Sequence, residues 1–157
     1  MILYRIDREK RRHQSLSGEG AELYGGRWNF PGHRAVYCAG SRSLAILEML
    51  VHIDLKYQMP EDRILLSIEI AAEVRIKSKE IFDLENGWND FLYNEHSQKV
   101  FGDFVRENQA AVLSVPSVIV PEEYNFILNP LHPDFSKIQV TNIRALNLDP
   151  RIVAFRP

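Results

Sequence analysis

The chain contains only one cysteine, Cys38, in 157 residues. A single thiol excludes an internal disulfide framework and a cysteine-rich zinc ribbon, and it fits a reducing compartment. No apolar run approaches the roughly 20 residues that a membrane-spanning helix needs. The first residues, MILYRIDREKRRHQS, become basic too early for a secretory signal peptide. We therefore expect a cytoplasmic protein that does not insert into a membrane.

Strong charge of one sign is also absent. Lys and Arg together number 19, Asp and Glu number 21, and the formal net charge is −2. A mildly acidic chain is a poor candidate for binding nucleic acid by itself. Hydrophobic residues make up 45% of the chain, enough to form a real core. This length suits a single domain spanning residues 1–157.

Several common catalytic motifs are missing. The chain has no Gly-rich phosphate loop of the P-loop or Rossmann type and no G-x-S-x-G nucleophile motif. No group of His, Cys and Asp residues has convincing metal-ligand spacing, so we expect no metal. Cys38 has no supporting context for nucleophilic catalysis. Any chemistry must therefore come from residues that are scattered along the sequence.

Hydrophobic patterning predicts a mixed α+β domain. Two helices are predicted, at 41–54 with Ser41 or Ser43 as N-cap and at 96–113 with amphipathic spacing. Apolar residues cover every side of the first helix, so we expect it to be buried. Short strands are predicted at 1–6, 35–39, 63–70, 74–76, 117–121, 125–130 and 136–146, and a polar loop at 8–26. The strands do not alternate regularly with helices, which argues against a doubly wound parallel sheet.

Glu48 stands out because it lies in LAILEMLVH, within the helix that we expect to be buried. An unpaired buried carboxylate is strongly unfavourable unless it takes up a proton. Glu48 therefore either pairs with an arginine or borders a polar cleft. His52 follows four residues later, on the same helical face, and is a weaker candidate for the same pocket.

The stretch YGGRWNFPG, residues 24–32, places an arginine between glycines and a tryptophan. The guanidinium of Arg27 is permanently charged and presents a planar set of donors that suits pyrophosphate or carboxylate. Gly25 and Gly26 allow the backbone to approach a ligand closely. Trp28 either stacks on a ring or fills the core. The alternative is a tight turn whose arginine pairs with Glu48.

Other polar residues lie in segments predicted as strands. Tyr37 sits in a strand just before the Glu48 helix, and strand tyrosines are most often part of the core. Ser117, Asn125 and Asn129 interrupt apolar stretches and need hydrogen-bond partners if they are buried. His132 lies between prolines, which favours a structural role.

Three blocks in order carry a resemblance to a known family. GGRWN (25–29), VYCA followed by SLAILEMLVH (36–52), and VPSVIVPEEYNFILNPLHPDF (115–135) resemble the RES domain over nearly the whole chain. The family is named for an Arg, a Glu and a Ser, which the resemblance places at Arg27, Glu48 and Ser117. The family's tyrosine falls at Tyr37.

The resemblance implies a fold similar to that of ADP-ribosyltransferases, with small mixed sheets around an NAD cleft and a few helices. It implies a bacterial toxin of a toxin–antitoxin system that consumes NAD by hydrolysis or phosphorolysis. The implied partner is an Xre-type antitoxin with a helix-turn-helix, which would block the active site and make the DNA contacts. The resemblance also allows a homodimer within that complex.

The expected roles follow from the chemistry of NAD cleavage. Nicotinamide leaves as a neutral molecule, so no general acid is needed, and one carboxylate, Glu48, favours the oxocarbenium-like transition state. Arg27 would hold the pyrophosphate or ribose, and Tyr37 would pack against the nicotinamide–ribose. Further predicted substrate contacts are Gly26, Trp28, His52, Ser117 and Asn129. Phosphorolysis would need a second anion site, for which Arg34 and Arg42 are candidates.

Two other functions compete with NAD consumption. A protein ADP-ribosyltransferase would use the same cleft, but the chain lacks the Ser-Thr-Ser block and the Glu-x-Glu pair of the arginine-modifying transferases. A catalytically silent module would only bind an antitoxin and repress transcription. The presence of Arg27, Tyr37 and Glu48 together argues against the silent module.

Overall fold

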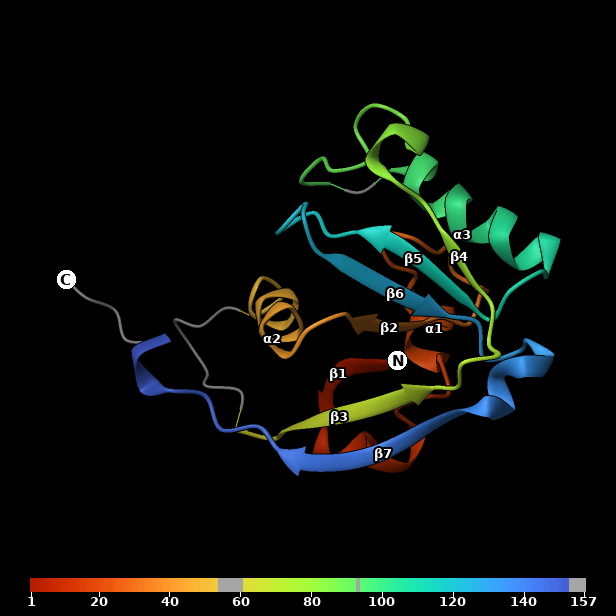
Figure 1. Cartoon of the computed structure of the whole chain (residues 1–157). Helices are drawn as coiled ribbons and strands as arrows, with labels where there is room; N and C mark the ends of the chain where they lie inside the picture. Colours follow the sequence, from red (N-terminus) through yellow and green to blue (C-terminus); the bar gives the residue numbers. More distant parts are fainter. Residues whose placement is uncertain (54–60, 93, 153–157) are drawn as a thin grey trace.

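A computed structural model describes residues 1–53, 61–92 and 94–152. Its strands form one mixed sheet in the order β4-β5-β6-β2-β1-β3-β7 (Figure 1). All neighbouring pairs are antiparallel except β4 with β5, which is parallel. The strands are β1 (Ile2–Arg8), β2 (Val36–Ala39), β3 (Arg63–Ile70), β4 (Ile76–Ser78), β5 (Val112–Pro116), β6 (Tyr124–Leu128) and β7 (Ile138–Ala145). The α+β class is confirmed, and the strands that we expected in small sheets join into a single one.

Three α-helices accompany the sheet in the described part of the chain. They are α1 (Glu19–Tyr24), α2 (Arg42–Leu50) and α3 (Glu95–Glu107). Short 3-10 helices occur at η1 (Glu9–Gln14), η2 (Ile81–Asp83), η3 (Pro133–Lys137) and η4 (Pro150–Ile152). In Figure 1, α2 lies beside β1 and β2, while α3 lies at the β4–β5 end of the sheet. Among the described residues, no helix has both the length and the apolar character needed to cross a membrane.

Both predicted helices form, and capping residues set their ends. The Ser41 side chain accepts a hydrogen bond from Leu44 N at 3.1 Å, which confirms it as the N-cap of α2. Asn94 caps α3 in the same way through Ser97 N at 3.3 Å. Asn108 adopts a left-handed conformation with φ 49° and ends α3. The prediction of a helix to residue 113 was therefore too long, because the apolar residues after this turn belong to β5.

Three other expectations were wrong. The stretch 8–26, predicted to be a loop, contains η1 and α1. The strand predicted at 117–121 lies earlier, at β5, because the Ser117 hydroxyl accepts hydrogen bonds from Ile119 N and Val120 N and turns the chain there. Helix α2 is only partly buried, since Leu47 at its surface and Val51 at its end are 40% and 59% exposed. An apolar surface is thus open beside Glu48.

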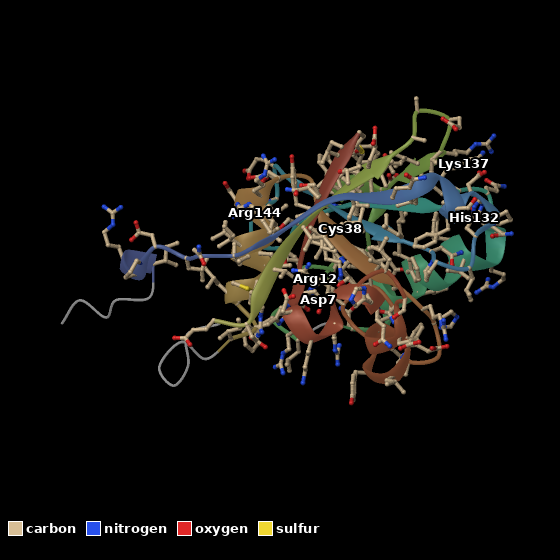
Figure 2. The ribbon with its side chains drawn as sticks, turned by 90° about the horizontal axis from the view of Figure 1, so that it is seen from below. Asp7, Arg12, Cys38, His132, Lys137 and Arg144 are labelled. Carbon is tan, nitrogen blue, oxygen red and sulfur yellow. The ribbon has the colours of Figure 1, made fainter. Side chains whose placement is uncertain are left out.

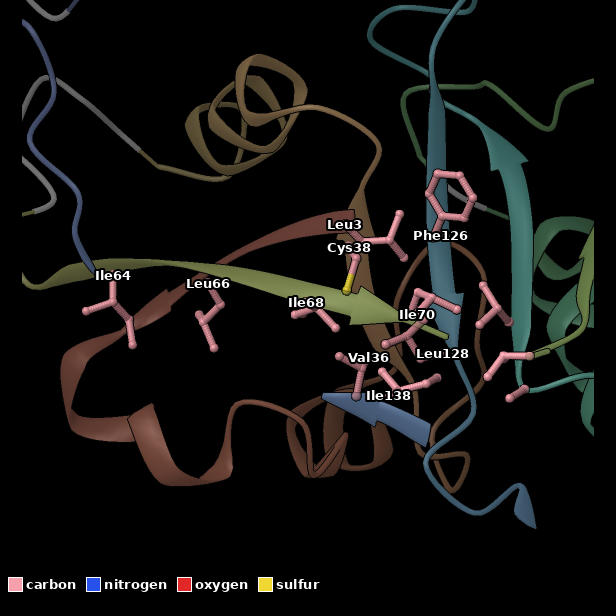
Figure 3. Packing of buried hydrophobic residues seen from close by; sticks show 13 residues of the cluster. Leu3, Val36, Cys38, Ile64, Leu66, Ile68, Ile70, Phe126, Leu128 and Ile138 are labelled. Atoms are coloured by element: carbon pink, nitrogen blue, oxygen red, sulfur yellow. The ribbon is translucent and has the colours of Figure 1, made fainter. Parts of the chain in front are cut away.

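The sheet has two faces of different character, set by the alternation of side chains along each strand. Register pairs Val36 with Leu128 and Cys38 with Phe126, and these side chains point to one face. There they pack with Leu3, Ile64, Leu66, Ile68, Ile70 and Ile138 in a continuous apolar cluster, which we call the closed face (Figure 3). Figure 2 shows Cys38 in the middle of the molecule, with Lys137 and Arg144 near opposite ends of β7.

The opposite face, which we call the site face, carries the intervening residues of the same strands. Tyr37 lies opposite Ile127, and Ala39 lies opposite Asn125. Beneath α3 this face is apolar, with Phe101, Phe104, Leu113, Val115 and Ile127 in one buried cluster. Toward α2 the face carries a small apolar cluster of Ala39, Leu44 and Ala45, and the contact between Asn125 and Glu48 also lies on this side.

Candidate functional site

Glu48 of α2 is held by two donors that come from the sheet. Ser117 Oγ donates to Glu48 Oε1 at 2.8 Å, and Asn125 Nδ2 donates to the same oxygen. Ser117 follows β5 and Asn125 lies in β6, so residues about 70 positions away in sequence converge on one carboxylate. Both partners can donate to an ionised carboxylate, which is a pure acceptor. Glu48 is partly exposed, and both of these hydrogen bonds use the same carboxylate oxygen.

Ser117 is fully buried, and its hydroxyl uses its whole hydrogen-bonding capacity within the protein. Its oxygen accepts from Ile119 N at 3.1 Å and from Val120 N at 3.2 Å. With both acceptor positions occupied, its single O–H is directed to Glu48. In this arrangement Ser117 supports Glu48 and has no capacity left for the substrate contact that we predicted.

Tyr37 connects the sheet to the GGRWN loop. Its hydroxyl donates to Asn29 Oδ1 at 2.7 Å and accepts from Trp28 N at 3.1 Å. A Cβ added to Gly26 would lie only 2.8 Å from this hydroxyl. The close approach that Gly26 permits is therefore to Tyr37. The ring of Tyr37 is partly buried against the apolar cluster beneath α3, so Tyr37 is a core residue with a polar tip.

Asn29 organises the loop and was missed in the sequence analysis. It is completely buried, and its Nδ2 lies within 2.9–3.1 Å of the carbonyl oxygens of Ala21, Phe30 and His33. Gln98 of α3 secures the outside of the same loop by donating to the Gly26 and Asn29 carbonyls. The signal available in the sequence was an asparagine next to two glycines and Pro-Gly, a composition typical of a turn stabilised by side chains.

Arg27 projects from this loop toward the segment before α3. Its guanidinium donates to the carbonyl oxygens of Trp88 at 3.0 Å and Asp90 at 2.9 Å, the second bond being exposed. Within the described residues, no ion pair joins Arg27 to Glu48. The interpretation of the loop as a turn whose arginine pairs with Glu48 is thus wrong, because Ser117 and Asn125 occupy that carboxylate instead.

Trp28 fills the core. It is 3% exposed and packs against Trp88, with ring centroids 6.1 Å apart and planes inclined by 31°. Of the two roles that the sequence left open, filling the core describes this position and stacking on a substrate ring does not.

Two predicted pocket residues form no hydrogen bond with Glu48 within the described part of the chain. His52 follows the end of α2 and is exposed, with its backbone N–H bonded to Met49 O. Asn129 lies beyond the far end of β6, where its Oδ1 accepts from Leu131 N at 3.0 Å and stabilises a turn. His132 likewise has a structural contact, since its Nδ1 accepts from Asp134 N. Asn125, which lies in β6, is the asparagine that donates to Glu48.

The two arginines considered for a second anion site already have contacts. Arg34 pairs with Glu22 at 3.0 Å, and the Arg42 guanidinium lies 4.4 Å above the Tyr4 ring.

Burial raises the pKa of the Cys38 thiol to about 12, so this side chain is no nucleophile near neutral pH. Across residues 1–53, 61–92 and 94–152, no three His, Cys, Asp or Glu side chains gather as metal ligands.

The arrangement brings a positioned carboxylate and a polar aromatic side chain to one face. Tyr37 and Asn125 are diagonal neighbours across β2 and β6, roughly 7–8 Å apart between Cα atoms. Glu48 lies against Asn125, and the Arg27 loop lies against Tyr37. A carboxylate whose position is fixed by neutral donors can stabilise positive charge that develops on a bound sugar.

Comparison with known proteins finds relatives that match nearly the whole chain. The chain is 39% identical to "Prs ADP-ribosylating toxin" of Sphingobium sp. (strain YBL2), covering 96% of this chain and 95% of that protein. It is 41% identical to "Toxin Res" of Photorhabdus laumondii, covering 98% and 97%. The fold is similar to that of a chain in the crystal structure of the M. tuberculosis MbcT–MbcA toxin–antitoxin complex, with a TM-score of 0.77. That match is 20% identical and covers 97% of this chain and 86% of the other.

A family model covers the part of the chain from which the candidate site is built. A model of the RES domain matches residues 2–149, which include the Arg27 loop, Tyr37, Glu48 and Ser117. The chain therefore belongs to the RES domain family.

Proposed function

We propose that this chain is the toxin of a bacterial toxin–antitoxin system and that it consumes NAD by cleaving the nicotinamide–ribose bond. The observation that carries the proposal is the fixed position of Glu48. Ser117, just after β5, and Asn125, in β6, both donate to one oxygen of its carboxylate. Support also comes from relatives named as toxins, one of them as ADP-ribosylating. ADP-ribosylation breaks the same bond of NAD.

The chemistry needs one carboxylate and little else. As the nicotinamide–ribose bond breaks, positive charge develops on the ribose, and a fixed negative charge beside it lowers the barrier. The departing ring becomes neutral and needs no proton, so a second carboxylic acid of the kind used in glycoside hydrolysis is not required. Glu48 meets this requirement because its position is fixed before the substrate binds.

The remaining residues would place the dinucleotide. Arg27 would bind the pyrophosphate, because it brings a permanent charge to the exposed end of the GGRWN loop. The ring of Tyr37 would flank the nicotinamide–ribose on the site face, next to Asn125 and Glu48. Asn29 and Gly26 would act through the loop, by keeping Arg27 and Tyr37 in a fixed relation.

An antitoxin partner follows from the same proposal. We expect a helix-turn-helix antitoxin of the Xre type to cover Glu48 and to supply the DNA contacts, since this chain has a net charge of −2. The exposed Leu47 and Val51 provide an apolar rim beside Glu48 that a partner would bury. A complex that forms yet leaves NAD turnover unchanged would contradict the blocking role.

A second candidate is mono-ADP-ribosylation of a protein. The name of the Sphingobium relative, at 39% identity, favours it. All three reactions begin by breaking the nicotinamide–ribose bond and differ in the acceptor of the ADP-ribose. The acceptor is a protein side chain in transfer, water in hydrolysis and phosphate in phosphorolysis.

The test is a time course of NAD loss with purified protein, with and without inorganic phosphate. Glu48→Gln keeps the size of the side chain and removes its charge, and we expect it to lower the rate by about 10³-fold, as removal of a key electrostatic stabiliser does. Glu73→Gln, at an exposed turn, is the matched control and should turn over normally. A faster reaction with phosphate identifies phosphorolysis.

The same reactions are repeated with labelled NAD and a bacterial extract. A labelled protein band that requires Glu48 would support transfer over free cleavage. No NAD loss and no labelled band would overturn both activities and leave a silent antitoxin-binding module.

A further inference from the structure

Asn125 occupies a central and rigid position in the sheet. It lies in β6, between β2 and β5, where register pairs it with Ala39 on one side and Val115 on the other. Backbone pairing on both sides fixes the direction of its side chain, which alternates strictly with its neighbours. Phe126, the next residue, points to the closed face, so the Asn125 amide is directed to the site face beside Glu48.

Two donors meet on one oxygen of Glu48. The Asn125 amide and the Ser117 hydroxyl both bond to Oε1, and within the described residues no hydrogen bond to Oε2 is formed. This asymmetry restrains the carboxylate, because Oε1 is tied both to Asn125 of β6 and to Ser117, which follows β5. A carboxylate on a helix whose outer side is exposed would otherwise rotate freely about its terminal bonds.

We infer that Asn125 is a positioning residue for Glu48. Its amide, together with the Ser117 hydroxyl, holds one carboxylate oxygen so that the other faces the ribose of the bound substrate. This inference rests on the proposed function for its consequence in catalysis. An amide suits the task because it donates without titrating, so this donor is the same at every pH.

Other titratable groups around Glu48 are committed elsewhere or exposed. On β1, Arg5 bonds to the Tyr37 carbonyl and to Asp7, and Tyr4 lies beneath Arg42. Among the described residues, further titratable groups on the surrounding elements are Tyr37, bonded to Asn29, Glu123, bonded to Ser41, and the exposed Glu122 and His52. Asn125 and Ser117 are therefore the groups that decide how Glu48 is oriented.

The decisive variant is Asn125→Asp, which keeps the shape and replaces the amide by a carboxyl group. At acidic pH the two carboxyl groups share a proton, and the introduced group still donates to Glu48. As the pH rises the shared proton is lost, and the two negative charges repel each other. The Glu48 carboxylate then moves away from position 125. We expect the kcat of this variant relative to wild type to fall at least about 10-fold between mildly acidic and mildly alkaline pH.

Two further variants separate positioning from a loss of folding. Asn125→Ala removes the donor at every pH, and we expect kcat to fall about 10- to 100-fold without pH dependence, the range for a hydrogen bond to a charged group. Asn142→Asp makes the same chemical change at an exposed site on β7 and should match wild type throughout. Thermal unfolding of each variant at each pH reports folding separately.

The inference would be overturned if the kcat of Asn125→Asp relative to wild type did not depend on pH and equalled that of Asn125→Ala. A lowered melting temperature in the same variant would then assign the loss to folding. A second measurement needs no turnover, namely the side-chain amide resonance of Asn125 by NMR. We expect it to shift when Glu48→Gln removes the charged acceptor, and an unchanged resonance would contradict the contact. The proposed function could fail while the inference holds. In that case wild type would not consume NAD, but the Asn125 resonance would still shift in Glu48→Gln.

Discussion

The closed face and the site face are built from the same strands and differ in what their side chains do. On the closed face, Val36 and Leu128 are completely buried and pack in the apolar cluster that includes the Cys38 thiol. On the site face, Tyr37 and Asn125 use the polar ends of their side chains to hold a loop and a carboxylate. Because successive residues of a strand point to opposite faces, a substitution on one face can leave the other unchanged. We expect stability to be controlled mainly from the closed face and chemistry from the site face.

The largest expected effect on stability is on the closed face. Ile68 is fully buried in the middle of β3 and packs in the cluster of Figure 3. Ile68→Ala should lower the free energy of unfolding by about 2–5 kcal/mol, through lost burial and the cavity left behind. Urea denaturation measures this, with Leu131→Ala as the control at a 69% exposed position where little change is expected. The KM for NAD of the folded variant should match wild type, and a large shift would show that the faces are coupled.

A smaller loss of stability, joined to a loss of activity, is expected at Asn29. Asn29→Ala leaves the carbonyl groups of Ala21, Phe30 and His33 without their shared donor and removes the acceptor of Tyr37. We expect about 2–4 kcal/mol of destabilisation, since each buried polar group left unpaired contributes about 1–3 kcal/mol. NAD turnover should fall as well, because the loop carries Arg27. Unchanged turnover in a folded Asn29→Ala protein would separate the loop from the site.

The contact between Gly26 and Tyr37 gives a still smaller effect that a double-mutant cycle isolates. Gly26→Ala places a methyl group 2.8 Å from the Tyr37 hydroxyl, closer than real contacts allow. In a Tyr37→Phe background this oxygen is gone, and the same substitution should be better tolerated. We expect a coupling of about 0.5–3 kcal/mol in unfolding free energy. Additive effects would mean that Gly26 is required for a different reason, namely its contact with Asn29.

Much of the fold was predictable because it depends on local patterns. The strand at 63–70 and the cap at Ser41 follow from apolar runs and hydroxyl chemistry, and the structure has both. The boundary between α3 and β5 was missed, since Ala110 to Leu113 are apolar in a way that suits either a buried helix or a buried strand. Pairing of β5 with β6 decides between them, and this pairing is not a local property.

The environment of Glu48 in the candidate site was predictable in part. Glu48 attracted attention as a carboxylate among apolar residues, and the need for a partner was correct. An arginine was the expected partner, but two neutral donors meet the need. Asn125 and Asn129 illustrate the limit, because both interrupt the same apolar stretch and only register places Asn125 toward Glu48 and Asn129 at a turn.

The smallest expected effect is on the closed face again, at its single thiol. Burial raises the pKa of Cys38 to about 12, whereas an unfolded cysteine has a pKa of about 8.5. At about pH 8 the native thiol therefore stays protonated, so iodoacetamide should leave the folded protein unmodified and fully active. Denaturing urea should restore rapid labelling, and Cys38→Ala is the unreactive control. Because the folded state disfavours the thiolate, the unfolded chain loses this proton first as pH rises, and stability should decline above about pH 8.5. Rapid labelling without urea would show that the closed face opens in the native state, and it would remove the contrast between the two faces.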